Sequence, residues 1–247
     1  MKEKFTDRTE MILGRCGVAR LEQARVAVFG VGGVGGYAVE ALARAGVGAL
    51  DLIDSDKVSV SNINRQIIAT TKTVGQYKTE AAKDRIAEIN PSCSVTCHNV
   101  FFSEETESSL DLSKYDYIID AIDSVSSKVR LVELSHAAGI PIISAMGAGN
   151  KLDPTAFRVA DISKTAVCPL AKAVRTSLRR RGINHLKVVY SEEAPSVAQS
   201  LAEDKCNPEA PEQKKADDKR ALGSLSFVPS VMGLILAGEV IKDLAKG

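Results

Sequence analysis

A glycine-rich segment at residues 30–35 constrains the fold more than any other part of the sequence. It reads GVGGVG, follows the apolar run RVAVFG at residues 25–30 and precedes an alanine-rich helical pattern at residues 37–44. The order G-x-G-x-x-G after a strand and before a helix predicts a turn whose backbone can approach a phosphate group. The helix N-terminus then supplies backbone N–H groups with partial positive charge. We therefore predict that four glycines bind a nucleotide: Gly30, Gly32, Gly33 and Gly35.

Strands and helices alternate through the first half of the chain. Further buried strands are predicted at residues 49–54, 115–123 and 141–149, and helical periodicity appears at residues 75–89 and 125–138. Strands that alternate with helices favour a mainly parallel sheet with right-handed crossovers. The predicted fold class is α/β, a Rossmann-like doubly wound sheet.

The second half has a different pattern. We expect the whole chain to form one domain, with a nucleotide-binding core at residues 1–150 and a substrate-specific extension at residues 151–247. An amphipathic helix is predicted at residues 170–182, and the polar, aperiodic segment 191–220 is interpreted as a mobile loop. The last part, residues 224–244, predicts a short strand and a closing helix that packs on the sheet.

Composition excludes several classes of protein. The net charge is +1 with 26% charged residues, the N-terminus lacks the apolar region of a signal peptide, and no apolar run is long enough to cross a membrane. We therefore expect a soluble, cytoplasmic protein with no membrane partner. The five cysteines are odd in number and scattered, without a Cys-x-x-Cys pair, which argues against a disulfide framework and a structural zinc site.

The residues after the second strand distinguish ATP from NAD. Asp54 closes that strand, where an acidic residue bonds ribose hydroxyls. Arg65 and Lys78 follow, and hydride transfer needs no such cations, whereas chemistry at the α-phosphate needs them to stabilise developing charge. Asp123 ends the predicted strand 115–123 at the edge of the sheet where ligands bind, and a carboxylate there suits Mg²⁺. The polar side chains in this part of the sequence are Asp54, Asp56, Asn62, Arg65, Gln66, Lys78 and Asp123.

Four motifs resemble those of the ThiF/MoeB/E1-like family of ATP-dependent adenylating enzymes. In chain order they are GVGGVGG, DxDxVxxSNxNRQ, VGxxK and DAIDS, within residues 1–150. The resemblance implies ATP and Mg²⁺ as cofactors and a homodimer. Arg8, in RTEMILG, resembles an N-terminal arginine that reaches the partner subunit's ATP site in such dimers.

The same resemblance implies a role for each matching residue. It places Gly32 and Gly35 along the ATP, Asp54 and Asp56 at the ribose, Asn62, Arg65 and Gln66 near the phosphates, Lys78 on the phosphate chain and Asp123 on Mg²⁺. The implied catalytic residues are Arg65, Lys78, Asp123 and Arg8.

The second half resembles one branch of this family, the tRNA threonylcarbamoyladenosine dehydratases. The resemblance rests on GAGNKLDPTAFRVADISKT at residues 147–165 and on KRALGSLSFVPSVMGLILAGEVIKDL at residues 219–244. It implies that ATP activates the carboxylate of N6-threonylcarbamoyladenosine in tRNA as an acyl-adenylate. The carbamoyl group of the same side chain can then attack intramolecularly, at high effective concentration. No cysteine of the enzyme is required for this cyclisation.

A basic stretch at residues 168–190 is the candidate RNA surface. It contains six Lys or Arg residues and no acidic residue. Lys172, Arg175 and Arg179 have the spacing of one helix face, which suits the binding of tRNA phosphates. The same pattern is also typical of an ordinary solvated helix face.

Three other functions remain open. A sulfur-carrier-protein adenylyltransferase, which activates a C-terminal Gly-Gly carboxylate, shares every motif up to Asp123. It would need Cys168 or Cys206 for any thioester or persulfide step. For the chain in general, we also keep a sulfur-transfer or redox protein as a candidate partner. An NAD-dependent oxidoreductase disagrees with the SNINRQ segment and Lys78. A catalytically silent scaffold that binds tRNA or a partner disagrees with the complete set of Arg65, Lys78 and Asp123.

Overall fold

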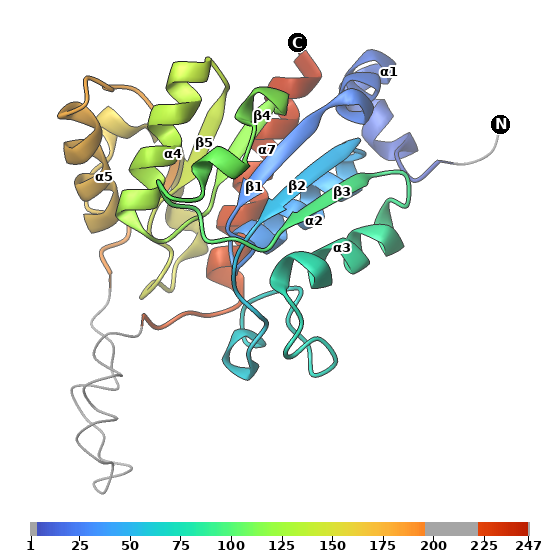
Figure 1. Cartoon of the computed structure of the whole chain (residues 1–247), viewed down its shortest axis with the longest axis horizontal. Helices are drawn as coiled ribbons and strands as arrows, with labels where there is room; N and C mark the ends of the chain where they lie inside the picture. The colour runs from blue at the N-terminus through green and yellow to red at the C-terminus, as the bar shows by residue number, and fades with distance from the viewer. Residues whose placement is uncertain (1–3, 196–221, 247) are drawn as a thin grey trace, which may run out of the picture.

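The structure is a computed structural model that describes residues 4–195 and 222–246. Its centre is a seven-stranded sheet with the strand order β3-β2-β1-β4-β5-β7-β6 (Figure 1). All neighbouring strands are parallel except β6, which runs antiparallel to β7 at the edge. The order β3-β2-β1-β4-β5 reverses direction between β1 and β4, and a doubly wound sheet binds ligands at such a switch point. The predicted fold class is confirmed.

The helices and strands have the following bounds. The strands are β1 (Arg25–Phe29), β2 (Ala49–Ile53), β3 (Ser94–His98), β4 (Tyr117–Asp120), β5 (Ile142–Ala145), β6 (Phe157–Asp161) and β7 (Lys187–Ser191). The α-helices are α1 (Asp7–Gln23), α2 (Gly35–Ala45), α3 (Lys78–Ile89), α4 (Val125–Ala138), α5 (Pro169–Arg179) and α7 (Phe227–Lys246). Short 3₁₀ turns include η1 (Val60–Asn62) and η5 (Ile162–Lys164).

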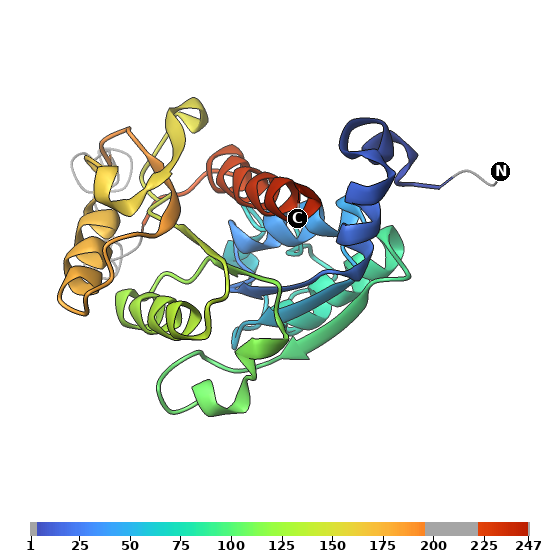
Figure 2. The same cartoon turned by 90° about the horizontal axis from the view of Figure 1, so that it is seen from above.

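Helices cover both faces of the sheet. The α2, α3 and α7 helices pack on one face, and α4 packs on the other, with α5 beside it (Figure 2). Alternate residues of the strands face opposite layers: Val26 and Val28 of β1 contact the α2 side, whereas Ala27 and Phe29 contact the α4 side. Burial on both faces explains why the strands are continuous apolar runs in the sequence.

The last helix packs against the glycine turn at the other end of the chain. A β-carbon on Gly233 of α7 would lie 2.2 Å from the carbonyl oxygen of Val34, so only glycine permits this approach. One side of α7 is fully buried, with Val228, Met232 and Leu236 at its centre. The turn is therefore held from outside by a helix that lies far from it in the sequence.

Several predicted element bounds needed correction. The helix expected at residues 75–89 begins at Lys78, and the helix expected at 170–182 is α5. The strand expected early in residues 224–244 is wrong: residues 222–226 form no strand. Their backbone instead pairs with a loop, because Asn150 exchanges hydrogen bonds with Gly223 through its backbone N–H and its side-chain oxygen.

Other parts of the chain were not anticipated or cannot be compared. The helix α1 and the strands β6 and β7 were not predicted, and β7 pairs with β5, so the sheet continues into the second half. Of the expected mobile loop, Ser191 belongs to β7, and residues 196–220 lie outside the described residues. Within the part of the chain that the structure describes, no helix has the length and apolar character needed to span a membrane.

Candidate active site

A cleft of about 1040 Å³ opens along the carboxyl ends of four strands. Its lining includes the residues that follow each strand end: Gly30 after β1, Asp54 after β2, Ala121 after β4 and Met146 after β5. It also includes residues from the second half, among them Lys151 and Cys168. The cleft therefore lies at the switch point of the sheet, where doubly wound folds bind ligands.

The structure brings nearly all predicted nucleotide-binding residues to this cleft. Those that line it are Gly30, Gly32, Gly33, Asp54, Asp56, Asn62, Arg65, Gln66, Lys78 and Asp123. Gly35 does not line it, and its binding to the nucleotide stays a prediction. A β-carbon on Gly35 would lie 1.8 Å from the carbonyl oxygen of Gly30, so this glycine allows the turn to close on the start of α2.

Gln66 supplies a polar group without a partner among the described residues. Its side chain is 6% exposed and lines the cleft, yet its Oε1 atom accepts no hydrogen bond there. A buried polar atom without a partner costs free energy, so such an atom in a cleft indicates a missing donor. The side chain lies beside the open side of Gly32, where a β-carbon would be 3.7 Å from Gln66 Nε2. A ligand with hydroxyl or amino donors fits this position.

Two carboxylates fix the position of Lys78. The ammonium lies 2.6 Å from Asp56 Oδ2 and 3.9 Å from Asp54 Oδ1. Asp54 itself accepts hydrogen bonds from the backbone N–H groups of Val31 and Asp56, both at 2.8 Å. Burial raises the pKa of the Asp54 carboxyl, and the positive charge of Lys78 opposes that rise. The Asp54 carboxylate therefore links the glycine turn, through Val31, to Lys78 at the first residue of α3.

Arg65 and Asn62 belong to one turn. Asn62 Oδ1 accepts the backbone N–H of Ser59 and so caps η1. The guanidinium of Arg65 donates through Nη1 to the carbonyl of Ser61 and to Asn64 Oδ1. It makes no ion pair with the described residues, so its positive charge is available to an anion in the cleft. Asn62 therefore mainly stabilises the turn that positions Arg65.

Asp123 is an exposed carboxylate at the cleft, two residues before the start of α4. The described residues contain no group of three or more His, Cys, Asp or Glu residues that could hold a metal ion together. Mg²⁺ is commonly bound by one or two carboxylates together with substrate phosphates, and does not need such a cage. Asp123 fits this mode of binding.

Arg8 lies far from the cleft of its own chain. It is exposed on α1, whose start packs beside the end of α2, where Thr6 Cγ2 would be 2.9 Å from a β-carbon on Gly46. The start of α1 lies near the ends where the strands begin (Figure 1), whereas the cleft lies at their carboxyl ends. Any contact of Arg8 with a nucleotide must therefore involve a second subunit.

The predicted basic face on α5 is only partly available to a ligand. Lys172 and Arg179 are exposed and make no ion pair with residues 4–195 or 222–246. Arg175 instead turns inward and donates to the carbonyl of Thr165 at 2.9 Å, which ties α5 to η5. A spacing of three and four residues placed these side chains on one face, but the guanidinium of Arg175 satisfies backbone carbonyls. We therefore reassign Arg175 to a structural role.

Two features of the site were not predicted. Lys151 follows β5, lines the cleft and is 3% exposed. Below the cleft, Lys128 of α4 pairs with Asp120 at the end of β4, and both side chains are fully buried. Ser144 Oγ donates to the same carboxylate at 2.5 Å. In the sequence the only signals were a lysine after a glycine-rich strand end and the first aspartate of DAIDS.

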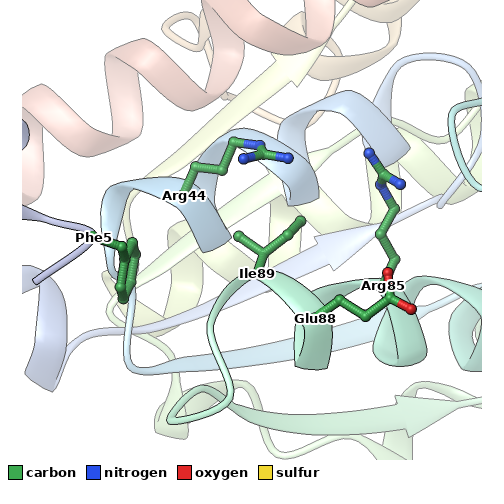
Figure 3. A pocket seen from close by; sticks show the side chains of 5 residues that line it. All are labelled: Phe5, Arg44, Arg85, Glu88 and Ile89. Carbon is green, nitrogen blue, oxygen red and sulfur yellow. The ribbon is translucent and has the colours of Figure 1, made fainter.

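A second, smaller pocket lies between the ends of α2 and α3. Figure 3 shows the residues that line it, Phe5, Arg44, Arg85, Glu88 and Ile89. Its volume is about 420 Å³. Arg44 and Arg85 both bind the carboxylate of Glu40, at 2.7 and 2.5 Å. Both guanidinium groups therefore already have a carboxylate partner, and the pocket lies near the starts of β2 and β3, away from the carboxyl ends of the strands. We do not assign a site here.

The fold and the cleft together define a nucleotide-binding α/β protein suited to chemistry at phosphate. The model of the ThiF family matches residues 6–246, and the chain belongs to the ThiF family. A tRNA threonylcarbamoyladenosine dehydratase from Bacillus subtilis is 45% identical over 240 residues, which cover 97% of this chain and 94% of that protein. The family resemblance stated from the sequence is confirmed.

Two further relatives differ in how much of this chain they match. The solved structure of the E. coli tRNA N6-threonylcarbamoyladenosine dehydratase TcdA in complex with ATP is 32% identical, with a TM-score of 0.83, and the match covers 98% of this chain and 93% of that one. A molybdopterin-synthase adenylyltransferase from Salmonella typhimurium is 41% identical, but only over 128 residues, which cover 52% of this chain and 51% of that protein.

Proposed function

We propose that this protein is an ATP-dependent enzyme that dehydrates N6-threonylcarbamoyladenosine in tRNA and so cyclises its side chain. One observation carries this proposal: a single cleft joins the glycine turn and Lys78 to residues of the second half, including Lys151 and Cys168. The full-length match to a dehydratase includes that second half, whereas the match to the adenylyltransferase covers about half of the chain. The substrate-binding half of the cleft thus follows the dehydratases.

The reaction proceeds in two steps. A carboxylate oxygen of the modified base attacks the α-phosphorus of ATP, pyrophosphate leaves, and an acyl-adenylate forms. The carbamoyl group of the same side chain then attacks the acyl carbon, loses a proton and releases AMP, so that the base has lost one water. Because the second step is intramolecular, it benefits from a high effective concentration and needs no cysteine of the enzyme.

The side chains of the cleft have roles that follow from their charge and position. Lys78 and Arg65 stabilise the charge that develops on the α-phosphate and on the departing pyrophosphate. Asp123 would hold Mg²⁺, which neutralises phosphate charge when bound. Gln66 Oε1 accepts a donor from the nucleotide. In a homodimer, Arg8 of one subunit adds a further cation to the cleft of the other.

The reaction as written consumes ATP and needs neither sulfur nor electrons. A sulfur-transfer or redox partner protein stays a prediction. Cys168, one candidate for sulfur chemistry, is 3% exposed in the cleft wall, and Cys206 lies outside the described residues. A tRNA substrate favours the cytoplasmic location predicted from the sequence, and the division at residue 150 also stays a prediction.

Mass spectrometry of tRNA nucleosides tests this function. After incubation with enzyme and ATP, N6-threonylcarbamoyladenosine should be replaced by a product lighter by one water, with AMP and pyrophosphate formed in equal amounts. Unmodified tRNA is the matched control and should not stimulate pyrophosphate release. Release that depends on a carrier protein ending in Gly-Gly, and not on tRNA, would instead establish the sulfur-carrier adenylyltransferase function.

The exposed cations of α5 supply a separate prediction about tRNA binding. The double substitution Lys172→Glu and Arg179→Glu should weaken tRNA binding at least about tenfold and lower the salt slope by about two, one unit for each phosphate contact. ATP affinity should not change. Filter binding across a salt series measures both quantities, with the exposed pair Lys83→Glu and Lys114→Glu as the control. Equal losses in both double variants would show that α5 has no specific part in tRNA binding.

A further inference from the structure

Lys151 is a buried lysine that the phosphate chemistry of the cleft does not use. It follows β5 in the loop that begins at Gly147, and its side chain is 3% exposed while lining the cleft. The loop lies on the β5 side, whereas Lys78 and Arg65 approach from the segments after β2. Lys151 thus belongs to the half of the cleft that faces the substrate and not the phosphate chain.

The charge of Lys151 has no carboxylate partner among the described residues. Its Nζ donates to the backbone carbonyl of Glu193, which is a neutral acceptor. The carboxylate of Glu193 accepts the backbone N–H groups of Leu152 and Asp153, at 2.9 and 3.0 Å, and makes no ion pair with Lys151. An ammonium has three donors, so the group retains both its charge and unused hydrogen-bonding capacity.

The other buried lysines of the described chain are paired. Lys128 lies 2.9 Å from the carboxylate of Asp120, and Lys78 lies 2.6 Å from that of Asp56. Burying an ammonium without a counter-charge is costly, and charged groups in proteins are therefore paired when they are buried. Lys151 differs from both in this respect, which indicates that an anionic group from outside the described residues compensates its charge.

We propose that Lys151 binds the carboxylate of the tRNA side chain and holds it for attack on the α-phosphorus of ATP. This inference rests on the proposed function. Of the anions in that reaction, the nucleotide phosphates already have Lys78 and Arg65, and the substrate carboxylate has no other assigned cation. Lys151 lines the cleft, and the hydrogen bond to the Glu193 carbonyl holds its ammonium in one position, so that the carboxylate meets a positioned charge.

Replacing Lys151 by Met tests this role. Because charge-assisted hydrogen bonds are the strong ones, KM for the modified tRNA should rise about 10- to 100-fold, while ATP affinity stays within about twofold of that of the wild type. Lys151→Arg keeps the charge and should recover part of this loss. Lys164→Met, which removes an exposed lysine of η5, is the matched control and should leave KM unchanged.

The measurements are steady-state pyrophosphate release against tRNA concentration and calorimetric titration with ATP. If Lys151→Met fails to fold, Lys151→Gln keeps a donor for the Glu193 carbonyl without the charge and replaces it in the test. An unchanged KM in the uncharged variants overturns the proposal, and so does a loss of ATP affinity as large as the loss for tRNA, which would assign Lys151 to a phosphate. Wild-type enzyme that does not respond to modified tRNA would overturn the proposed function itself.

Discussion

Lys78→Met is expected to lower tRNA-dependent pyrophosphate release at least about 100-fold, the usual cost of removing one positioned group that stabilises transition-state charge. Lys78 is 6% exposed, and Asp54 and Asp56 hold its ammonium in the cleft. In this low-dielectric position a cation acts strongly on the charge that develops at phosphate. The initial rate of pyrophosphate release, at saturating ATP and tRNA, measures the loss.

The stability of this variant should change much less than its activity. Asp56, the closer partner, has a side chain that is 65% exposed, so water can solvate it after the lysine is removed. Asp54, the more buried partner, keeps its hydrogen bonds from the backbone N–H groups of Val31 and Asp56. Lys83→Met on the exposed side of α3 is the control for a lysine removed from the same helix. If Lys78→Met kept more than a tenth of wild-type turnover, Lys78 would have no role in the chemical step.

Lys128→Met should destabilise the protein by about 3–5 kcal/mol, because it leaves a buried carboxylate without its cation. Both side chains of the Lys128–Asp120 pair are fully buried, and their charged atoms lie 2.9 Å apart. Asp120 also accepts from Ser144 Oγ and from the backbone N–H of Ile122, so its position is fixed. Urea unfolding, followed by circular dichroism, gives the free energy of unfolding.

A double substitution separates the lost pair from the lost side-chain volume. Asp120→Asn removes the charge that Lys128→Met leaves uncompensated, so the double variant should be more stable than Lys128→Met alone. The cycle of two single variants and one double variant then gives the coupling energy directly. Additive losses would mean that the two charges do not stabilise each other in the folded protein.

Local sequence motifs were sufficient to predict many of the residues that line the cleft. The segment from Asp54 to Gln66 and the glycine turn each lie next to a strand end, so that a parallel sheet brings them to one edge. Lys78 and Asp123 follow from the same topology. Here the chemistry of the residues and their order along the chain were sufficient, because the sheet fixes where each strand ends.

Other features of the fold and of the site depend on tertiary contacts, which the spacing of residues along the sequence does not reveal. Arg175 has the periodicity of an exposed face, yet the carbonyl of Thr165 draws it inward. The burial of Lys151 depends on Glu193, which is more than forty residues away along the chain. The strand expected near residue 224 failed because that backbone pairs with Asn150 and not with the sheet. Each of these cases was decided by a partner in another element or loop, which periodicity within one element cannot show.

The contact between α7 and the glycine turn sets an order of events during protein synthesis. The turn and the strands around it leave the ribosome early, but Gly233 and the buried side of α7 are made near the end of the described chain. Until then, the apolar surface that α7 covers is exposed on the nascent chain, a state that is prone to aggregation. The cleft, which includes Pro229 of α7, is therefore completed only after translation of this last helix.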